Sequence, residues 1–423
     1  MAAEERIDVA DLRVGMFIHL DLGWMRHPFP LSSFRIGSED QLVVLRQLGL
    51  KQVRWSPELS ELQPTTGPAA DPQGIEAVPP GATDPAEQIA QAHREALRLQ
   101  REALSLCEAQ YREAAQAACD MLEGAVRQPL STGEQAKSLA SSLVAKMLGM
   151  GDMNLRLLTE AAGDRAGAHS LNVTLISLLL GSAIGLGQDE LTELGAGALL
   201  HDVGKLELEA RFRSRLDSLT PPEVAVYQLH VNKGAALAQP MGLSAASLAV
   251  IAQHHEHADG TGFPNRILGE QMHPFARIVA LVNRFDGLCN PPLGGRLHTP
   301  HEALSLMFAQ GRSRYDATLL NAFIRMMGVY PPGSAVQLTD DRYALVVAVN
   351  PVRPLKPRVL VHEPQVPASE ALLLNLEDEP TLGIRRSLRP ADLPSAAAHY
   401  LKPRTRLAYF IQPAALGAEP PAC

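Results

Sequence analysis

Several features that mark particular classes of protein are scarce in this chain. It has only four cysteines in 423 residues, far apart and without a CxxC pair, so we expect free thiols in a reducing compartment rather than a disulfide framework. There is no basic surplus, because 46 acidic residues outweigh 38 basic ones and the net charge is −8. This excludes a protein that coats a nucleic acid polymer. An anionic ligand would therefore need a local attraction, such as bound metal.

Secretory and membrane signals are also missing. The first residues, MAAEERIDVADLRVGM, are charged from the fourth position and have no apolar core of the kind found in signal peptides. The most apolar run, Leu171–Gly187, is slightly too short for a membrane span and contains polar residues such as Asn172 and Thr174. We expect this run to be a buried helix and the protein to be cytoplasmic.

Composition changes along the chain predict an amino-terminal half of three parts. Residues 1–61 combine a strand-like GMFIHLDL with a capped, helix-like SEDQLVVLRQLGL, which indicates a small α+β domain. Residues 62–86 are rich in Pro, Gly, Ala and Thr, as linkers are. Residues 87–128 lack proline and favour one long helix. That helix could form a homodimer as a coiled coil or pack onto the next domain.

The remainder predicts a helical domain and a short β-rich end. Residues 129–332 are a succession of helical segments separated by Gly and Pro. Residues 333–423 contain the strand-like runs AVQL, YALVVAV and RVLVH and a Pro-rich tail. The predicted fold class is therefore multidomain and mainly α, with an all-helical bundle, a small α+β amino-terminal domain and a β-rich carboxy-terminal extension.

Among the 14 histidines, some stand where they could bind metal. His/Asp and His/His pairs close apolar helical runs in ALLHDVGK and VIAQHHEHADGTGFP, and single histidines occur in AHSLNV and YQLHVNKGAAL. Any one of these is more often a surface or core residue than a ligand. Together they supply six ligands: His169, His201, Asp202, His230, His254 and His255. Imidazole and carboxylate suit Fe, Mn or Zn, and six ligands with Asp202 as a bridge suit two divalent ions.

Such a site suits hydrolysis of a phosphodiester. Metal coordination lowers the pKa of bound water from 15.7 toward ~7 and stabilises the charge on phosphate. Lys205 stands three residues after Asp202, and its ammonium could contact a non-bridging phosphate oxygen. By itself this lysine would be interpreted as a solvated residue at a helix end. Beside the metal ligands it indicates a catalytic or substrate-binding role.

The sequence HDVGK followed by HHEHADGTGFP resembles the HD-GYP group of the HD phosphohydrolase superfamily, bacterial signalling enzymes that hydrolyse cyclic di-GMP. The likeness extends from about His169 to Pro332 and includes ARIVALVNRFDGL and NAFIRMMGVYPPG. Residues 6–60, with RVGMFIHL and LGLKQVRW, resemble a domain of unknown function that often precedes HD-GYP domains. The resemblance implies a helical bundle with metals inside and cyclic di-GMP as substrate.

Carried over by position, the resemblance makes the same six residues metal ligands, with Asp202 and Lys205 as the catalytic residues and Lys205 as a contact to the substrate phosphate. It implies that Gly260, Gly262 and Phe263 shape a loop beside the substrate. Phe263 replaces the tyrosine of the family signature. Arg165 replaces a glutamate that helps some members hold a third metal, so two ions are the expected maximum.

Two further departures concern the end of the motif. The family's last aspartate ligand is Asn283 here, a neutral residue that could still ligate through its carbonyl, whereas the following aspartate survives as Asp286. The Arg-Pro-Tyr-Arg/Lys stretch that helps hold the substrate is replaced by CNPPLGGRLHTPHEAL, in which only Arg296 is a possible substitute.

These departures leave alternatives open. The first hypothesis is a cyclic di-GMP phosphodiesterase. Its rival is a weak or inactive domain that acts as a cyclic di-GMP sensor or as a protein-interaction module, and a third is an HD phosphohydrolase acting on other nucleotides. The amino-terminal domain and the 87–128 helix transmit a signal or mediate self-association, or else they only cover apolar surface.

Overall fold

A computed structural model of the chain describes residues 5–23, 26–27, 29, 32–61, 85–150, 153–158, 165–214, 219–292, 295–311, 313–349, 353–404 and 406–413. The chain divides into two compact units, Met1–Glu95 and Ala96–Cys423. All but the last two residues of the predicted linker, 62–86, lie outside the described residues.

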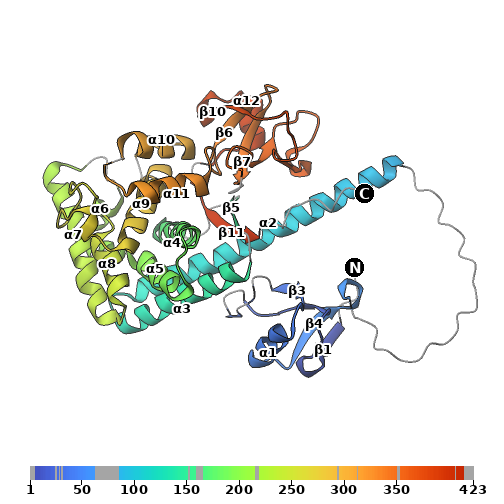
Figure 1. Cartoon of the computed structure of the whole chain (residues 1–423), viewed down its shortest axis with the longest axis horizontal. Coiled ribbons are helices and arrows are strands. Elements are labelled where there is room, and N and C mark those ends of the chain that lie inside the picture. Colours follow the sequence, from blue (N-terminus) through green and yellow to red (C-terminus); the bar gives the residue numbers. More distant parts are fainter. Residues whose placement is uncertain are drawn as a thin grey trace, which may run out of the picture. The chain divides into compact units, whose positions relative to one another are not determined.

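The first unit contains a four-stranded antiparallel sheet and helix α1 (Figure 1). The strand order is β1-β4-β2-β3, with β1 at Glu5–Asp8, β2 at Phe17–His19, β3 at Ser33–Arg35 and β4 at Gln52–Ser56. Helix α1 spans Glu39–Gln47, and the Ser38 side chain caps it by accepting a hydrogen bond from the Gln41 amide. Apolar side chains from sheet and helix, among them Ile18 and Leu45, form its buried core. The predicted α+β character of this region is confirmed.

The second unit is mainly helical. Its helices are α2 Pro85–Gly124 (which begins before this unit), α3 Pro129–Gly149, α4 Arg165–Ala183, α5 Gln188–Leu200, α6 Ala210–Ser214, α7 Pro221–Ala238, α8 Ala245–Gln253, α9 Pro274–Cys289, α10 Pro300–Gln310, α11 Ala317–Met327 and α12 Ser395–Leu401. A short 3-10 helix, η4, spans Val203–Glu207.

Helix α4 is the central helix of the bundle. It packs against α5, α9 and α11, which enclose it (Figure 1). Its segment Ala166–Ala183 is long and apolar enough to cross a membrane, yet 78% of that segment is buried inside the protein. A helix that is apolar all round is expected in such a position. The predicted core helix at Leu171–Gly187 therefore lies within the bundle.

The carboxy-terminal part forms a seven-stranded sheet with one strand from the helical region. The strands are β5 Met153–Leu157, β6 Ala335–Leu338, β7 Tyr343–Ala348, β8 Arg358–Val361, β9 Leu373–Asn375, β10 Ile384–Leu388 and β11 Tyr409–Pro413. Their order is β10-β6-β7-β5-β11, and β8 and β9 branch from β7. The sequence patterns predicted β6, β7 and β8, but only helices where β5 lies.

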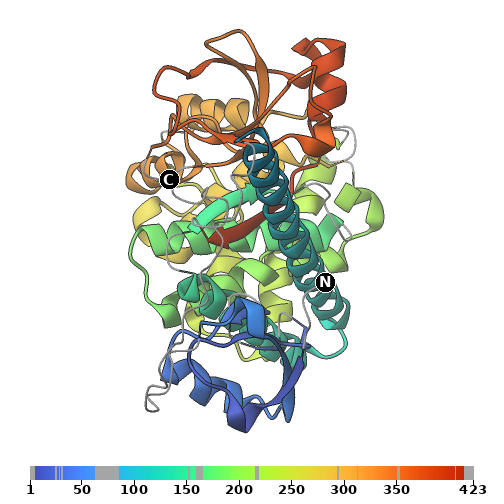
Figure 2. The same cartoon turned by 90° about the vertical axis from the view of Figure 1, so that its right-hand side faces the viewer.

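Strand β5 joins the last described strand of the chain to the bundle. It pairs antiparallel with β11, so that Leu157 lies opposite Tyr409 and Leu155 opposite Ile411. Figure 2 shows the two strands side by side in the interior of the unit. Because β5 lies between α3 and α4, the carboxy-terminal extension is continuous with the helical bundle rather than an appendage to it.

Helix α2 packs onto the bundle along its second half. Tyr111 is completely buried, and its ring meets the edge of Phe410 at 6.3 Å between centroids. A Cβ atom on Gly167 of α4 would lie 2.4 Å from Cys119 Sγ of α2, so the two helices are in close contact there. Of the two alternatives for this helix, the structure shows packing on the next domain; homodimerisation stays a prediction.

Candidate metal centre

The bundle brings all six predicted metal ligands to one place, and most of them stand at helix ends. His169 lies near the start of α4, His201 follows the last residue of α5, Asp202 precedes η4, His230 lies within α7, His254 follows α8 and His255 comes next. The apolar bodies of these helices are held in the core, and their ends present polar side chains to the same point.

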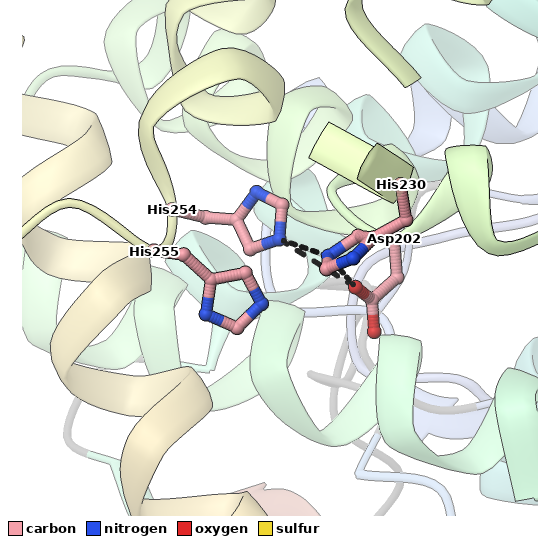
Figure 3. Close-up of side chains that lie close together, drawn as sticks. All are labelled: Asp202, His230, His254 and His255. Atoms are coloured by element: carbon pink, nitrogen blue, oxygen red, sulfur yellow. Dashed lines mark hydrogen bonds and ion pairs between the residues drawn. The ribbon is translucent and has the colours of Figure 1, made fainter. Parts of the chain in front are cut away.

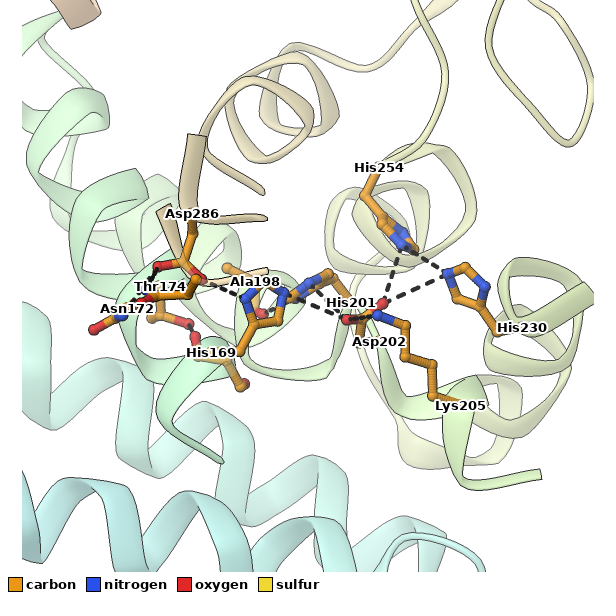
Figure 4. Close-up of polar contacts among 12 residues, drawn as sticks. His169, Asn172, Thr174, Ala198, His201, Asp202, Lys205, His230, His254 and Asp286 are labelled. Atoms are coloured by element: carbon orange, nitrogen blue, oxygen red, sulfur yellow. Dashed lines mark hydrogen bonds and ion pairs between the residues drawn. The ribbon is translucent and has the colours of Figure 1, made fainter. Parts of the chain in front are cut away.

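The carboxylate of Asp202 is the centre of this cluster. Its Oδ1 lies 3.5 Å from Nε2 of both His230 and His254 (Figure 3). Its Oδ2 lies 3.4 Å from Nε2 of both His169 and His201 (Figure 4). The donor atoms form two groups, each within 4.8 Å: His169, His201 and Asp202 in one, and Asp202, His230, His254 and His255 in the other. One carboxylate thus belongs to both groups and directs a different oxygen to each.

Backbone carbonyls orient most of the imidazoles. Three histidines donate Nδ1–H to the carbonyl three residues earlier: His201 to Ala198 at 2.7 Å, His230 to Tyr227 at 2.6 Å and His254 to Ile251 at 2.9 Å. Since a carbonyl can only accept, the proton of each neutral ring is on Nδ1. The Nε2 lone pair is then free for a cation, as in metal-ligating histidines generally.

Unsatisfied polar atoms indicate what this cluster lacks. Within the described part of the chain, His201 Nε2, Asp202 Oδ1 and His255 Nε2 are buried and have no hydrogen-bond partner. Buried polar atoms of native proteins nearly always have a partner. Divalent cations would satisfy all three atoms, so the residues present fit a metal site.

The ionisation of the histidines agrees with ligation. Burial lowers the pKa of His230 to about 3 and also lowers the pKa values of His201 and His255, so these rings are neutral. His169 differs. Burial lowers its pKa, but hydrogen bonds to Asp202 and Asp286 outweigh burial and raise the pKa to about 9. Without metal, the His169 ring is therefore protonated on both nitrogens, with Nδ1–H directed at Asp286 and Nε2–H directed at Asp202.

Lys205 contacts the shared carboxylate directly. Its Nζ lies 2.5 Å from Asp202 Oδ2 and 5.5 Å from the centroid of the Tyr227 ring (Figure 4). Burial alone would raise the pKa of Asp202, but Lys205 and His201 outweigh it and hold that pKa well below its usual range. Asp202 is therefore an anion, the form that binds metal.

Asp286 supports the site from behind. Its completely buried carboxylate places Oδ2 2.6 Å from Nδ1 of His169, on the side of the ring opposite Asp202 (Figure 4). The sequence showed that this aspartate survives but not what it contacts. A carboxylate on the apolar face of α9, in line with the buried Val282 and Cys289, was the available signal, because a buried charge needs a partner.

The remaining predicted residues line a cavity of about 1010 Å³ beside the cluster. Asn283, Phe263 and Arg296 are part of its wall. The Phe263 ring stacks on His255 with centroids 4.5 Å apart and an interplanar angle of 19°. Gly262 allows the loop to pass close behind, since a Cβ there would lie 2.5 Å from the His255 carbonyl oxygen.

The cavity wall also contains arginines that the sequence gave no reason to group with Lys205 and Arg296, the two cations predicted to contact the substrate. Besides Lys205, its wall contains Arg213, Arg284, Arg296 and Arg314. Among the residues that the structure describes, none of these four arginines forms an ion pair with a carboxylate. In a chain of net charge −8, they make the cavity locally attractive to anions.

Comparisons with known proteins agree with this architecture. A domain of unknown function, DUF3391, matches residues 4–136, and the HD domain matches residues 142–319. The chain is 28% identical over 368 residues to the cyclic di-GMP phosphodiesterase PA4108 of Pseudomonas aeruginosa, covering 84% of each protein. It is 32% identical over 137 residues to the 3′3′-cGAMP-specific phosphodiesterase 2 of Vibrio cholerae, covering 32% of this chain and 26% of that one.

Among solved structures, Bd1817, an HD-GYP-type protein from Bdellovibrio bacteriovorus, aligns with a TM-score of 0.42 and 16% identity over 76% of this chain and 98% of its own. The family matches confirm both resemblances stated from the motifs, the one at residues 6–60 and the one at the HDVGK segment. The chain therefore contains an HD domain at residues 142–319 and a DUF3391 domain ahead of it at residues 4–136.

Proposed function

We propose that this protein is a metal-dependent phosphodiesterase that hydrolyses cyclic di-GMP at a two-metal site. The observation that carries this proposal is the Asp202 carboxylate, whose two oxygens face two separate groups of imidazole nitrogens. The proposed ligands are His169, His201, Asp202, His230, His254 and His255, with Asn283 as a neutral seventh. Two divalent ions of Fe, Mn or Zn bound there would supply an acidified water and stabilise charge on phosphate.

The protein's own residues prepare this reaction. Burial keeps the imidazoles of His201, His230 and His255 neutral, and Lys205 keeps Asp202 anionic, so these groups are in their ligating form before metal arrives. His169 has to release a proton to ligate. With Asp202 serving as a metal ligand, the Lys205 ammonium would be available to a non-bridging phosphate oxygen. Phe263 holds the His255 ring by stacking on it, which restricts the direction of that ligand.

The cavity fits a compact dianion such as a cyclic dinucleotide. Its volume of about 1010 Å³ is at the upper end of small-molecule sites. Arg284 and Arg314 lie on α9 and just before α11, and both act electrostatically on Tyr315 and His257 in the same wall. They and Arg296 would bind the phosphate that is not being cleaved, in place of the missing Arg-Pro-Tyr-Arg/Lys stretch.

The test is metal analysis together with hydrolysis. Purified protein is stripped with a chelator, reloaded with Mn²⁺ or Fe²⁺, and assayed on cyclic di-GMP and on 3′3′-cGAMP, with linear pGpG and GMP separated as products. We expect about two ions per chain and cleavage of cyclic di-GMP. His201→Ala should lose metal and activity, whereas His93→Ala, an exposed histidine of α2, should retain both.

Other outcomes identify the alternatives. Tight binding of cyclic di-GMP without turnover at saturating metal would indicate the sensor, which the neutral Asn283 favours. Turnover of 3′3′-cGAMP alone would show that the substrate is not cyclic di-GMP, while the proposed metal-dependent hydrolysis would stand. A cytoplasmic location is part of the proposal, because none of the described cysteines, Cys107, Cys119 and Cys289, is in a disulfide.

A further inference from the structure

The carboxy-terminal strand reaches the back of the metal centre through two asparagines. Asn172 of α4 and Asn290, which follows α9, each donate from Nδ2 to Asp286 Oδ1, at 3.0 and 2.9 Å. Each also donates from the same nitrogen to the Leu407 carbonyl, at 2.9 and 3.0 Å. Both amide groups therefore bridge the buried carboxylate and the main chain just before β11.

The opposite ends of the two amides are satisfied by the same segment. The Leu407 amide donates to Asn290 Oδ1 at 2.7 Å, and the Tyr409 amide donates to Asn172 Oδ1 at 3.3 Å. Every donor and acceptor of the two side chains thus has a defined role, which leaves no alternative amide orientation. The side-chain amides of Asn172 and Asn290 hydrogen-bond to the main chain of residues 407–409 as the backbone of a neighbouring strand would.

This network determines which oxygen of Asp286 contacts His169. Two N–H groups occupy Oδ1, so Oδ2 is the oxygen directed at His169 Nδ1, 2.6 Å away. An acceptor at Nδ1 keeps the ring proton there and leaves Nε2 free for metal. A completely buried carboxylate would be costly without these donors.

We propose that Asn172 and Asn290 are positioning residues and that the segment Leu407–Tyr409 is a structural part of the metal centre, acting on His169 through Asp286. This inference rests on the proposed metal-binding function of His169. Leu407 lies far outside the HD domain match at 142–319. The carboxy-terminal sheet is then thermodynamically linked to metal binding, and the linkage is reciprocal.

The first test measures metal affinity in the full-length protein. Apoprotein is titrated with Mn²⁺, and we expect Asn290→Ala to weaken binding of one of the two ions by up to about 10-fold, less than the 10- to 100-fold typical for a group that bonds a ligand directly, since Asn290 acts through Asp286. Asn321→Ala, the same change at an exposed position of α11, should bind as wild type does. Excess Mn²⁺ should restore the turnover of Asn290→Ala.

A second variant keeps the inference testable if Asn290→Ala folds poorly. Asp286→Asn keeps the shape and can still accept from both asparagines, but it presents N–H to His169 Nδ1 and moves the ring proton to Nε2. We expect it to lose the ion held by His169 while the apoprotein melts near the wild-type temperature. A ¹⁵N spectrum of histidine-labelled apoprotein, recorded at a pH where His169 is neutral in both proteins, should show the changed tautomer of that one ring.

Hydrogen exchange tests the link to the strand. Mn²⁺ should slow amide exchange in residues 406–413 of wild type and of Asn321→Ala, and not of Asn290→Ala. Metal affinities within twofold of wild type for both Asn290→Ala and Asp286→Asn would overturn the inference, even if stability fell, because the network would then serve the fold alone. A wild-type protein that binds no metal would instead overturn the proposed function, and this inference with it.

Discussion

Asn283 stands where the HD-GYP resemblance places an aspartate ligand, and it lies in the cavity wall. Asp286, three residues later, is engaged with His169, Asn172 and Asn290, so it is not available to replace position 283 as a ligand. We therefore propose that an oxygen ligand from this part of α9 comes from Asn283.

We predict that Asn283→Asp increases metal occupancy and cyclic di-GMP hydrolysis at limiting metal. A carboxylate brings a full negative charge where the amide brings only a dipole, and hard dications bind more tightly as ligand charge increases. A gain of roughly tenfold in Mn²⁺ affinity, measured by titration and by hydrolysis rate against Mn²⁺ concentration, is expected. Equal occupancy and equal rates in both proteins would show that position 283 is not a ligand.

At the scale of single elements, α3 places a lysine side chain in the protein core. Lys146 is 1% exposed, and burial lowers its pKa to about 8, although Glu113 of α2 acts in the opposite direction. The folded protein therefore binds fewer protons than the unfolded chain between about pH 8 and 10.5, and this residue's contribution to stability rises with pH in that window. Below pH 8 its ammonium costs on the order of 1–2 kcal/mol, allowing for solvent screening.

We predict that Lys146→Met raises the free energy of unfolding at pH 7 and that its advantage over wild type shrinks between pH 8 and 10. Methionine has a similar length and no charge to desolvate. Urea unfolding of both proteins at pH 7, 8.5 and 10 measures this difference. Lys137→Met, an exposed lysine of the same helix, serves as the control and should show no such pH-dependent difference.

At the scale of the whole molecule, the metal ligands connect helices that are distant in sequence. They come from α4, the α5–η4 junction, α7 and the end of α8, and Asp286 adds α9. Ions bound there would hold the bundle together as well as take part in catalysis. The amino-terminal unit contributes none of these residues.

We predict that metal stabilises the second unit alone. At a free ion concentration about 1,000 times Kd, binding adds about 4 kcal/mol to the free energy of unfolding of the unit that binds it. In calorimetry, Mn²⁺ in place of chelator should raise the unfolding temperature of the Ala96–Cys423 unit and leave that of Met1–Glu95 unchanged. His201→Ala should make the two scans coincide. A shift that persists in this variant would place the stabilising ion elsewhere.

The sequence alone predicted what depends on local pattern. Helical spacing of apolar residues located the core helix around Leu171–Gly187, and strand-like runs located β6, β7 and β8. Adjacent ligand pairs such as His201 and Asp202 stand out because two polar residues that end an apolar run share one helix end whatever the rest of the fold does.

Only the tertiary structure decided what depends on contacts between distant segments. Strand β5 could not be predicted from local pattern, because its pairing with β11 is made by residues near the other end of the chain. The same holds for the role of Asp286, for Arg284 and Arg314 meeting at one cavity, and for Leu407 reaching the metal centre. Periodicity shows that a side chain is buried, but the partner that satisfies a buried charge is chosen by packing, and packing brings together residues that no local pattern connects.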